Sequence, residues 1–125
     1  MEIKSAKDLI VYQKAYALAL EIYRITLDFP ADERYSLGSQ IKRSSRSVCL
    51  NLREAWAKRR YEAHFISKLS DCQGENAETD TSLDFARDHG FISTERHRQL
   101  AGINEEVGKM LTSMICNPEK FLFKH

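Results

Sequence analysis

The sequence is poor in the residues that break regular structure. Its 125 residues include only 2 prolines and 5 glycines, which argues against an all-β chain, because the many turns of such a chain need these residues. Hydrophobic residues make up 42% and charged residues 30% of the chain, a composition typical of a globular protein. The sequence therefore predicts a single domain, residues 1–125, built from long helices.

Long apolar runs are also absent. No stretch of about 18 apolar residues occurs, so we predict no membrane-spanning segment. The first ten residues carry early charges and no apolar h-region, so we expect no secretory signal and a cytoplasmic location. The three cysteines, Cys49, Cys72 and Cys116, form no Cys-x-x-Cys pair, and we interpret them as buried thiols in a reducing compartment.

Known catalytic and metal-binding patterns are missing as well. A di-iron bundle needs Glu-x-x-His words, whereas the two Glu-x-His words, at 62–64 and 95–97, are one residue too short. This spacing places Glu and His about 200° apart on a helix. The chain also contains no glycine-rich phosphate loop and no nucleophile elbow. We predict no enzyme, no cofactor and no metal site; the alternative is a divalent cation held by Asp80 and Asp84.

Apolar residues recur every three or four positions in four segments, which is helical spacing. The segments run at about 8–29, 33–60, 62–89 and 93–116. Asp8 and Ser93 are suitable N-caps, Pro30 ends the first segment, and Gly90 follows the third as a left-handed C′ residue. Because the connections are short, neighbouring helices should be antiparallel. The pattern predicts an all-α, up-and-down antiparallel four-helix bundle.

The first helical segment carries an unusually wide apolar arc. On a heptad wheel its apolar sets merge and cover more than half of the circumference, whereas a surface helix of a monomeric bundle needs a narrower arc. We interpret the excess as the subunit interface of a homo-oligomer, formed by Val11, Ala15, Leu18, Ile22 and Ile25. The alternative is that three tyrosines widen the arc while their hydroxyl groups lie in water.

Charge is distributed unevenly, although the net charge is only +1. Residues 39–60 contain seven basic residues and one acidic residue, and residues 62–89 contain two basic and seven acidic residues, so the two segments carry +6 and −5. The basic residues of the first of these segments are Lys42, Arg43, Arg46, Arg53, Lys58, Arg59 and Arg60. Because Arg46, Arg53 and Arg60 are seven residues apart, they follow one face of a helix.

Two functions fit this basic face. It predicts binding of RNA or DNA, because Lys and Arg on a rigid face track the phosphates of a nucleic-acid backbone. Trp56, Tyr61 and His64 near its end are candidates for stacking on exposed bases. The alternative is that the basic face pairs with the acidic segment, within a subunit or across an interface, so that the charges set helix register and partner choice. A third possibility is a solvated face without a role.

Several local sequence words resemble those of a known family. They include Asp8–Ala15 (DLIVYQKA), Phe29-Pro30, Asn51-x-x-Glu54 and Gly90-Phe91-Ile92. Over residues 8 to about 115 the chain resembles the bacterial four-helix-bundle proteins encoded in intervening sequences of 23S ribosomal RNA. The resemblance implies an up-and-down bundle that assembles into a barrel-like homopentamer. After Asn51 the family usually continues Ile-Ala-Glu-Gly, and this chain departs from it with Leu-Arg-Glu-Ala.

The resemblance also bears on partners and on polar positions. A related family, the accessory proteins of diversity-generating retroelements, forms basic pentameric barrels that bind nucleic acid, which implies the same class of partner here. Asn51, Glu54 and Glu78 match polar positions of the family. We predict a structural polar layer near the bundle interior that fixes helix register, formed by Asn51, Glu54, Asn76, Glu78 and Thr79. The alternative for Glu54 is an exposed pair with Lys58 at i+4.

Overall fold

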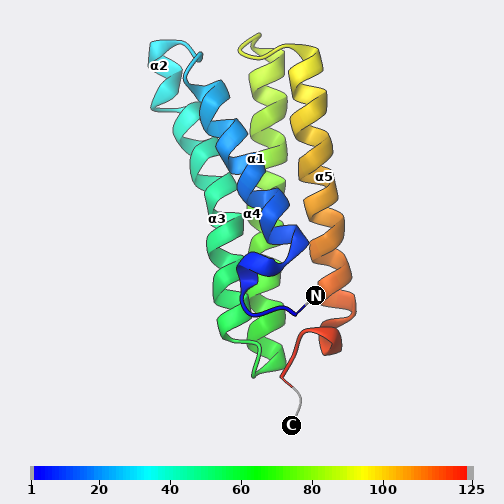
Figure 1. Cartoon of the computed structure of the whole chain (residues 1–125). Coiled ribbons are helices and arrows are strands. Elements are labelled where there is room, and N and C mark those ends of the chain that lie inside the picture. Colours follow the sequence, from blue (N-terminus) through cyan, green and yellow to red (C-terminus); the bar gives the residue numbers. More distant parts are fainter. Residues whose placement is uncertain (1, 124–125) are drawn as a thin grey trace.

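The computed structural model describes residues 2–123, which form helices joined by short turns (Figure 1). Four long helices run alternately up and down: α1 (Ile10–Thr26), α3 (Leu37–Ala57), α4 (Glu62–Asp88) and α5 (Thr94–Cys116). The short elements are the 3-10 turn η1 (Ala6–Asp8), the single-turn helix α2 (Ala31–Arg34) and the 3-10 turn η2 (Pro118–Lys120). The predicted all-α bundle of four antiparallel helices is confirmed for the single chain, and its described part contains no strand.

The first long helix begins later than the sequence predicts. Asp8 is not its N-cap, because Asp8 belongs to η1, and α1 begins at Ile10. The Asp8 carboxylate instead accepts hydrogen bonds from the backbone N–H groups of Lys4 (2.8 Å) and Ser5 (3.1 Å). These bonds lower the pKa of the Asp8 carboxyl, with a smaller contribution from the charge of Lys4. Asp8 therefore fixes the segment that leads into α1 rather than the first turn of α1.

The second predicted helix, 33–60, is divided and shortened. Its beginning forms α2, and the chain turns at Tyr35 and Ser36 before α3 starts. Gly38 permits this turn, since a Cβ there would lie 3.1 Å from the backbone oxygen of Glu33. At the other end α3 stops at Ala57, so Lys58, Arg59 and Arg60 lie in the turn before α4 and not on the face of a helix.

The apolar core consists of two clusters stacked along the bundle. The cluster near the chain termini includes Leu52, Phe65, Leu69 and Leu111, and the cluster at the opposite end includes Ile22, Ile41, Leu83 and Leu100. All eight side chains are at most 1% exposed. The amphipathic pattern is consistent with this single-chain core. No helix within residues 2–123 has the length and apolar character needed to cross a bilayer.

Both caps of the α4–α5 connection are confirmed. Gly90 has φ 76°, in the left-handed region. Its N–H donates to the carbonyl of Arg87 (2.9 Å), and the N–H of Phe91 donates to the carbonyl of Ala86 (2.8 Å), which are the two bonds of a Schellman motif. Ser93 caps α5, where its hydroxyl oxygen accepts a hydrogen bond from the N–H of Arg96 (3.0 Å).

Two of the three cysteines are buried as predicted. Burial raises the pKa of the Cys49 thiol to about 11 and is the main reason that the pKa of Cys72 rises to about 12. Both thiols therefore stay protonated at neutral pH. The interpretation is wrong for Cys116, which is the last residue of α5 and is exposed.

Two glycines give a matched stability test of this fold. We expect Gly90→Ala to destabilise the protein by about 1–2 kcal/mol, because an L side chain disfavours the left-handed backbone. Gly74→Ala should stabilise it by roughly 0.5–1 kcal/mol, since Gly74 lies inside α4 and a Cβ there meets nothing within 4 Å. Urea unfolding followed by circular dichroism measures both changes, and equal shifts of the two midpoints would contradict the assignment of Gly90 as the cap.

Candidate nucleic-acid interface

The basic face of α3 is split between two neighbouring helices. α3 packs against α4 on one side and against α1 on the other. At 100° per residue, Arg46 and Arg53 point within about 20° of each other, whereas Arg43 is rotated by about 60° from Arg46. Arg43 consequently faces α4, and Arg46 and Arg53 line a groove beside α1.

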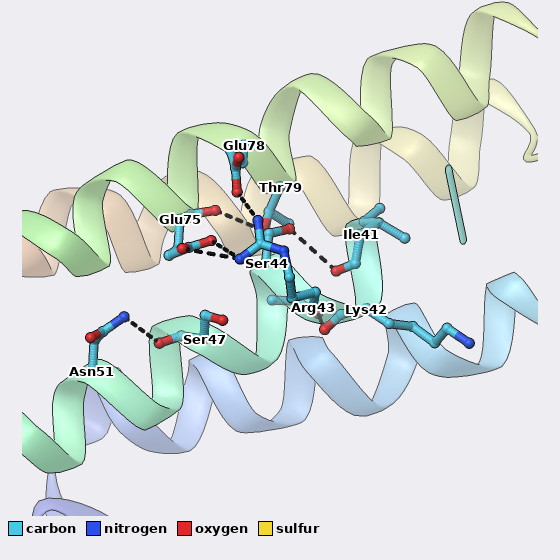
Figure 2. Close-up of polar contacts among 10 residues, drawn as sticks. Ile41, Lys42, Arg43, Ser44, Ser47, Asn51, Glu75, Glu78 and Thr79 are labelled. Atoms are coloured by element: carbon cyan, nitrogen blue, oxygen red, sulfur yellow. Dashed lines mark hydrogen bonds and ion pairs between the residues drawn. The ribbon is translucent and has the colours of Figure 1, made fainter. Parts of the chain in front are cut away.

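Arg43 pairs with the acidic helix, as the alternative interpretation of the basic face predicts (Figure 2). Its guanidinium donates to both carboxylate oxygens of Glu75 at 3.2 Å and also to Glu78. These carboxylates, Glu75 before Glu78, raise the pKa of Arg43. A second ion pair, between Glu54 and Lys68 (2.7 Å), joins the same two helices. Here the acidic residue lies on α3 and the basic residue on α4.

The other basic residues form no such pair. Within residues 2–123, no ion pair involves Lys42, Arg46, Arg53, Lys58, Arg59 or Arg60. By contrast, the acidic residues of α4 are largely occupied: Asp84 lies 2.8 Å from His97, and Asp88 lies 2.9 Å from Arg87. In the described part of α4, Glu62 and Asp80 are the acidic residues without a cation. Intramolecular pairing therefore accounts for one of the seven predicted basic site residues.

The residues near the end of α3 are arranged differently from the stacking site that the sequence predicts. The guanidinium of Arg59 lies 3.9 Å from the ring centre of Trp56 and 4.1 Å from that of Phe123. Tyr61 packs edge-on against His64, with ring centres 5.6 Å apart. One face of Trp56 is thus already covered by a cation, so Trp56 does not offer that face to a base.

A groove between α1 and α3 adjoins the basic face. It has a volume of about 530 Å³ and is lined by Tyr12, Tyr16, Ala19, Leu20, Tyr23, Arg46, Cys49, Leu50 and Arg53. Its walls are open to solvent, with Tyr16 51%, Leu20 45% and Leu50 63% exposed. The groove was missed by the sequence analysis. The sequence signal for the groove is the set of tyrosines that widens the apolar arc of α1. Helical periodicity alone does not separate these tyrosines from the apolar residues that fill the core.

The five residues predicted to form a subunit interface lie inside the single chain. Val11, Ala15, Leu18, Ile22 and Ile25 are 0–7% exposed and pack in the two core clusters. The prediction is wrong for these residues, because side chains that fill the core cannot also contact a second copy. The wide apolar arc of α1 therefore has two halves. The five buried residues face the interior of the bundle, and the tyrosine-rich half faces the groove.

A polar layer exists between the two apolar clusters, but its members differ from those predicted. Asn76 on α4 and Asn104 on α5 exchange hydrogen bonds: each side-chain amide donates to the backbone oxygen of the other at 3.0 Å. Ser44 and Thr79 share a hydrogen bond of 2.8 Å between α3 and α4 (Figure 2). Of the predicted layer, the structure therefore places Asn76 and Thr79 between the helices.

The other three predicted members lie nearer the surface. Glu54 and Glu78 have side chains 53% and 56% exposed and form the ion pairs described above. Asn51 is half-buried, and its amide donates to the carbonyl of Ser47 within α3 (3.0 Å; Figure 2). The prediction is wrong for Glu54 and Glu78 because their long side chains reach solvent from positions beside the α3–α4 contact. It is wrong for Asn51 because its amide bonds within α3 and does not join two helices. Glu54 also pairs with Lys68 rather than with Lys58.

Comparison with known proteins assigns the chain to a family. A model of the 23S rRNA-intervening sequence protein family matches residues 7–113. The chain belongs to this family. Among solved structures it is similar to a protein of unknown function from the S23 ribosomal protein family of Bacteroides thetaiotaomicron, with 28% identity and a TM-score of 0.79. The match covers 87% of this chain and 97% of the other. No functionally curated protein matches.

The polar layer gives a second prediction. We expect Asn104→Ala to destabilise the protein by about 1–3 kcal/mol, because the Asn76 amide loses the Oδ1 acceptor, and the Asn76 carbonyl loses the amide donor, that the buried Asn104 side chain supplies. Glu78→Gln should change stability by at most about 0.5 kcal/mol, as is usual for exposed residues. Urea midpoints measure both effects. If the two variants unfolded at the same urea concentration, the amide pair would not fix the helices.

Proposed function

We propose that this family member is a non-enzymatic protein that binds RNA or DNA through the α1-facing side of α3. The observation that carries the proposal is the imbalance of partners along α3. Arg46 and Arg53 form no ion pair in the described structure, while most of the acidic residues of α4 are paired with other cations. Cations held on a rigid helix without protein counter-ions suit the regularly spaced phosphates of a nucleic acid.

The turn after α3 extends this cationic surface. Lys58 and Arg60 are exposed and form no ion pair within residues 2–123. Arg59 is anchored by its hydrogen bond to the carbonyl of Trp56 (2.9 Å) and by the two flanking rings, so its charge is held in place. Phosphate contacts of this kind position a ligand without reading its sequence, and the proposal therefore concerns affinity and salt dependence rather than a sequence motif.

Salt dependence tests the proposal. Wild-type protein should retard single-stranded RNA at ~50 mM salt, a condition that favours non-specific binding, and the affinity should fall steeply as salt rises. Arg46→Gln/Arg53→Gln should reduce the slope of log affinity against log salt by about 1.4, because each lost phosphate contact on a single strand removes roughly 0.7. Fluorescence anisotropy of labelled RNA across a salt series gives the slope.

The control variant removes the same charge at the far side of the bundle. Arg98→Gln/Lys109→Gln lies on α5, and both side chains are more than 70% exposed. We expect its slope to equal that of the wild type. Equal slopes for all three proteins would place the phosphates elsewhere, and a wild type that retards neither RNA nor DNA at ~50 mM salt would end the nucleic-acid proposal.

A second candidate function, self-assembly without nucleic acid, is favoured by the outer apolar patch. The patch follows one side of α1 with Tyr16, Leu20 and Tyr23 and continues to Leu27 just beyond its end, all 44–51% exposed. Leu50, 63% exposed, extends it onto α3. Exposed apolar residues gathered on one face are typical of contacts between proteins. The family resemblance implies a homopentamer, and we propose that any contact between copies uses this patch, in place of the buried set predicted from the sequence.

The mass in solution tests self-assembly. If copies meet at this patch, Leu20→Glu should reduce the mass measured by light scattering at micromolar concentration, because a charge without a partner is costly to bury in an interface. The variant should keep its helical content, since Leu20 is half-exposed in the single chain. Ser113→Glu on α5 is the matched control. A wild type that is monomeric at this concentration would remove the assembly candidate.

A further inference from the structure

The α1–α3 groove combines aromatic rings with cations on opposite walls. Tyr12, Tyr16 and Tyr23 lie at intervals of four and seven residues, so all three project from one side of α1. The rings of Tyr12 and Tyr16 are 6.0 Å apart and inclined by 23°. Tyr16 and Tyr23 are 51% and 44% exposed, so a ligand in the groove can reach their rings.

The opposite wall carries the two arginines of the cationic face. Arg46 and Arg53 are two helical turns apart, or about 10 Å along α3. The guanidinium of Arg46 lies over one face of the Tyr23 ring, 6.0 Å from the ring centre, so it bridges the two walls at that end and leaves the other face of the ring to a base. Between the walls the floor is apolar, formed by the buried residues Ala19 and Cys49. Because burial raises the pKa of Cys49 to about 11, the floor carries no charge at neutral pH.

We propose that this groove binds an unpaired, single-stranded nucleic acid, with bases stacked on Tyr16 and Tyr23 and phosphates held by Arg46 and Arg53. The inference rests on the proposed function, since the two arginines belong to the same cationic face. It adds the class of ligand. In a duplex the faces of the bases are covered by their neighbours, whereas the bases of a single strand are free to stack on aromatic side chains.

The lining also bears on selectivity. Asn, Gln, Asp and Glu, which contact the edges of adenine and cytosine, are absent among the groove residues, and the two arginines, a residue type that contacts guanine edges, are assigned here to phosphates. Stacking on an aromatic ring accepts every base, because each has a π-face. The groove therefore binds single strands with little dependence on base sequence. Its volume of about 530 Å³ is within the range of small-molecule sites, about 300–1,000 Å³, so the groove holds a few bases rather than a folded RNA element.

Charge favours a nucleic acid over a second copy of the chain as the occupant. A strand supplies a phosphate at every nucleotide and an aromatic base beside it, which matches a wall of tyrosines that faces a wall of arginines. A second copy covers Leu20 and Leu50 equally well but must also bring carboxylates to both arginines. On α4, the most acidic helix, most carboxylates are already paired within their own chain, so that helix of a second copy is a poor source of them.

Oligonucleotides that distinguish contacts with bases from contacts with phosphates test the inference. The probes are labelled strands of about 12 nucleotides, within the usual site sizes of single-strand binders: oligo(U), an abasic strand of equal length, and a duplex. We expect oligo(U) to bind most tightly at fixed salt. Tyr16→Leu and Tyr23→Leu should each weaken oligo(U) binding about tenfold, within the range found for base–aromatic stacking, while the abasic affinity and the salt slope stay unchanged.

Tyr35→Leu is the matched control, since Tyr35 is 87% exposed and lies in the turn before α3, outside the groove. The groove inference would be overturned if oligo(U) and the abasic strand bound with equal affinity and if Tyr16→Leu and Tyr23→Leu left the affinity for oligo(U) unchanged. Phosphate binding by α3 would then remain intact. Loss of all binding in the wild type would overturn both. If the tyrosine variants reduced the mass of an assembly without changing affinity for oligo(U), the groove would hold a second copy, and the inference would fail.

Discussion

The register between α3 and α4 is the constraint on which the arrangement of the surface depends. The hydroxyl groups of Ser44 and Thr79 share a buried hydrogen bond of 2.8 Å, and the hydroxyl of Thr79 also donates to the carbonyl of Glu75. A shift of one helix along the other would break this bond and leave each hydroxyl only the carbonyl of its own helix, Ile41 for Ser44 and Glu75 for Thr79, and in a dry interior no water replaces the lost bond. Small side chains at this crossing also let the helices approach closely, and the long polar side chains are thereby set at the edge of the seam.

This register decides which cations of α3 are neutralised. It brings Arg43 to Glu75 and Glu78, and Glu54 to Lys68, so the α4 side of α3 is balanced. The α1 side has no such balance. Glu21, an acidic residue of α1, is turned toward α5, where it pairs with Arg96 and where the hydrogen bond with Arg96 lowers its pKa. The helix that borders Arg46 and Arg53 therefore offers tyrosines and no carboxylate.

Local signals predicted most of the fold, and long-range packing accounts for the errors. The caps at Gly90 and Ser93 depend on neighbours within a few residues, and both are confirmed. The break between α2 and α3 depends on the contact of Gly38 with the carbonyl of Glu33, and periodicity does not register such a contact. For the same reason a heptad wheel located the wide apolar arc of α1 but did not show which half faces the bundle. That question is settled by the other three helices.

The site was predicted less well than the fold, because charge counts do not show which side of a helix a residue occupies. The basic face from Lys42 to Arg60 was interpreted as one surface, yet Arg43 is paired, the last three members lie in a turn, and only Arg46 and Arg53 border the groove.

These two arginines have a double effect on the molecule. An exposed apolar patch alone favours aggregation, and cations beside such a patch oppose it by repelling like-charged copies. The same charges attract an anionic strand, so solubility of the free protein and affinity for a ligand depend on the same residues. Any loss of binding on their removal must therefore be compared with the mass of the protein, because an uncharged groove is also a better surface for self-association.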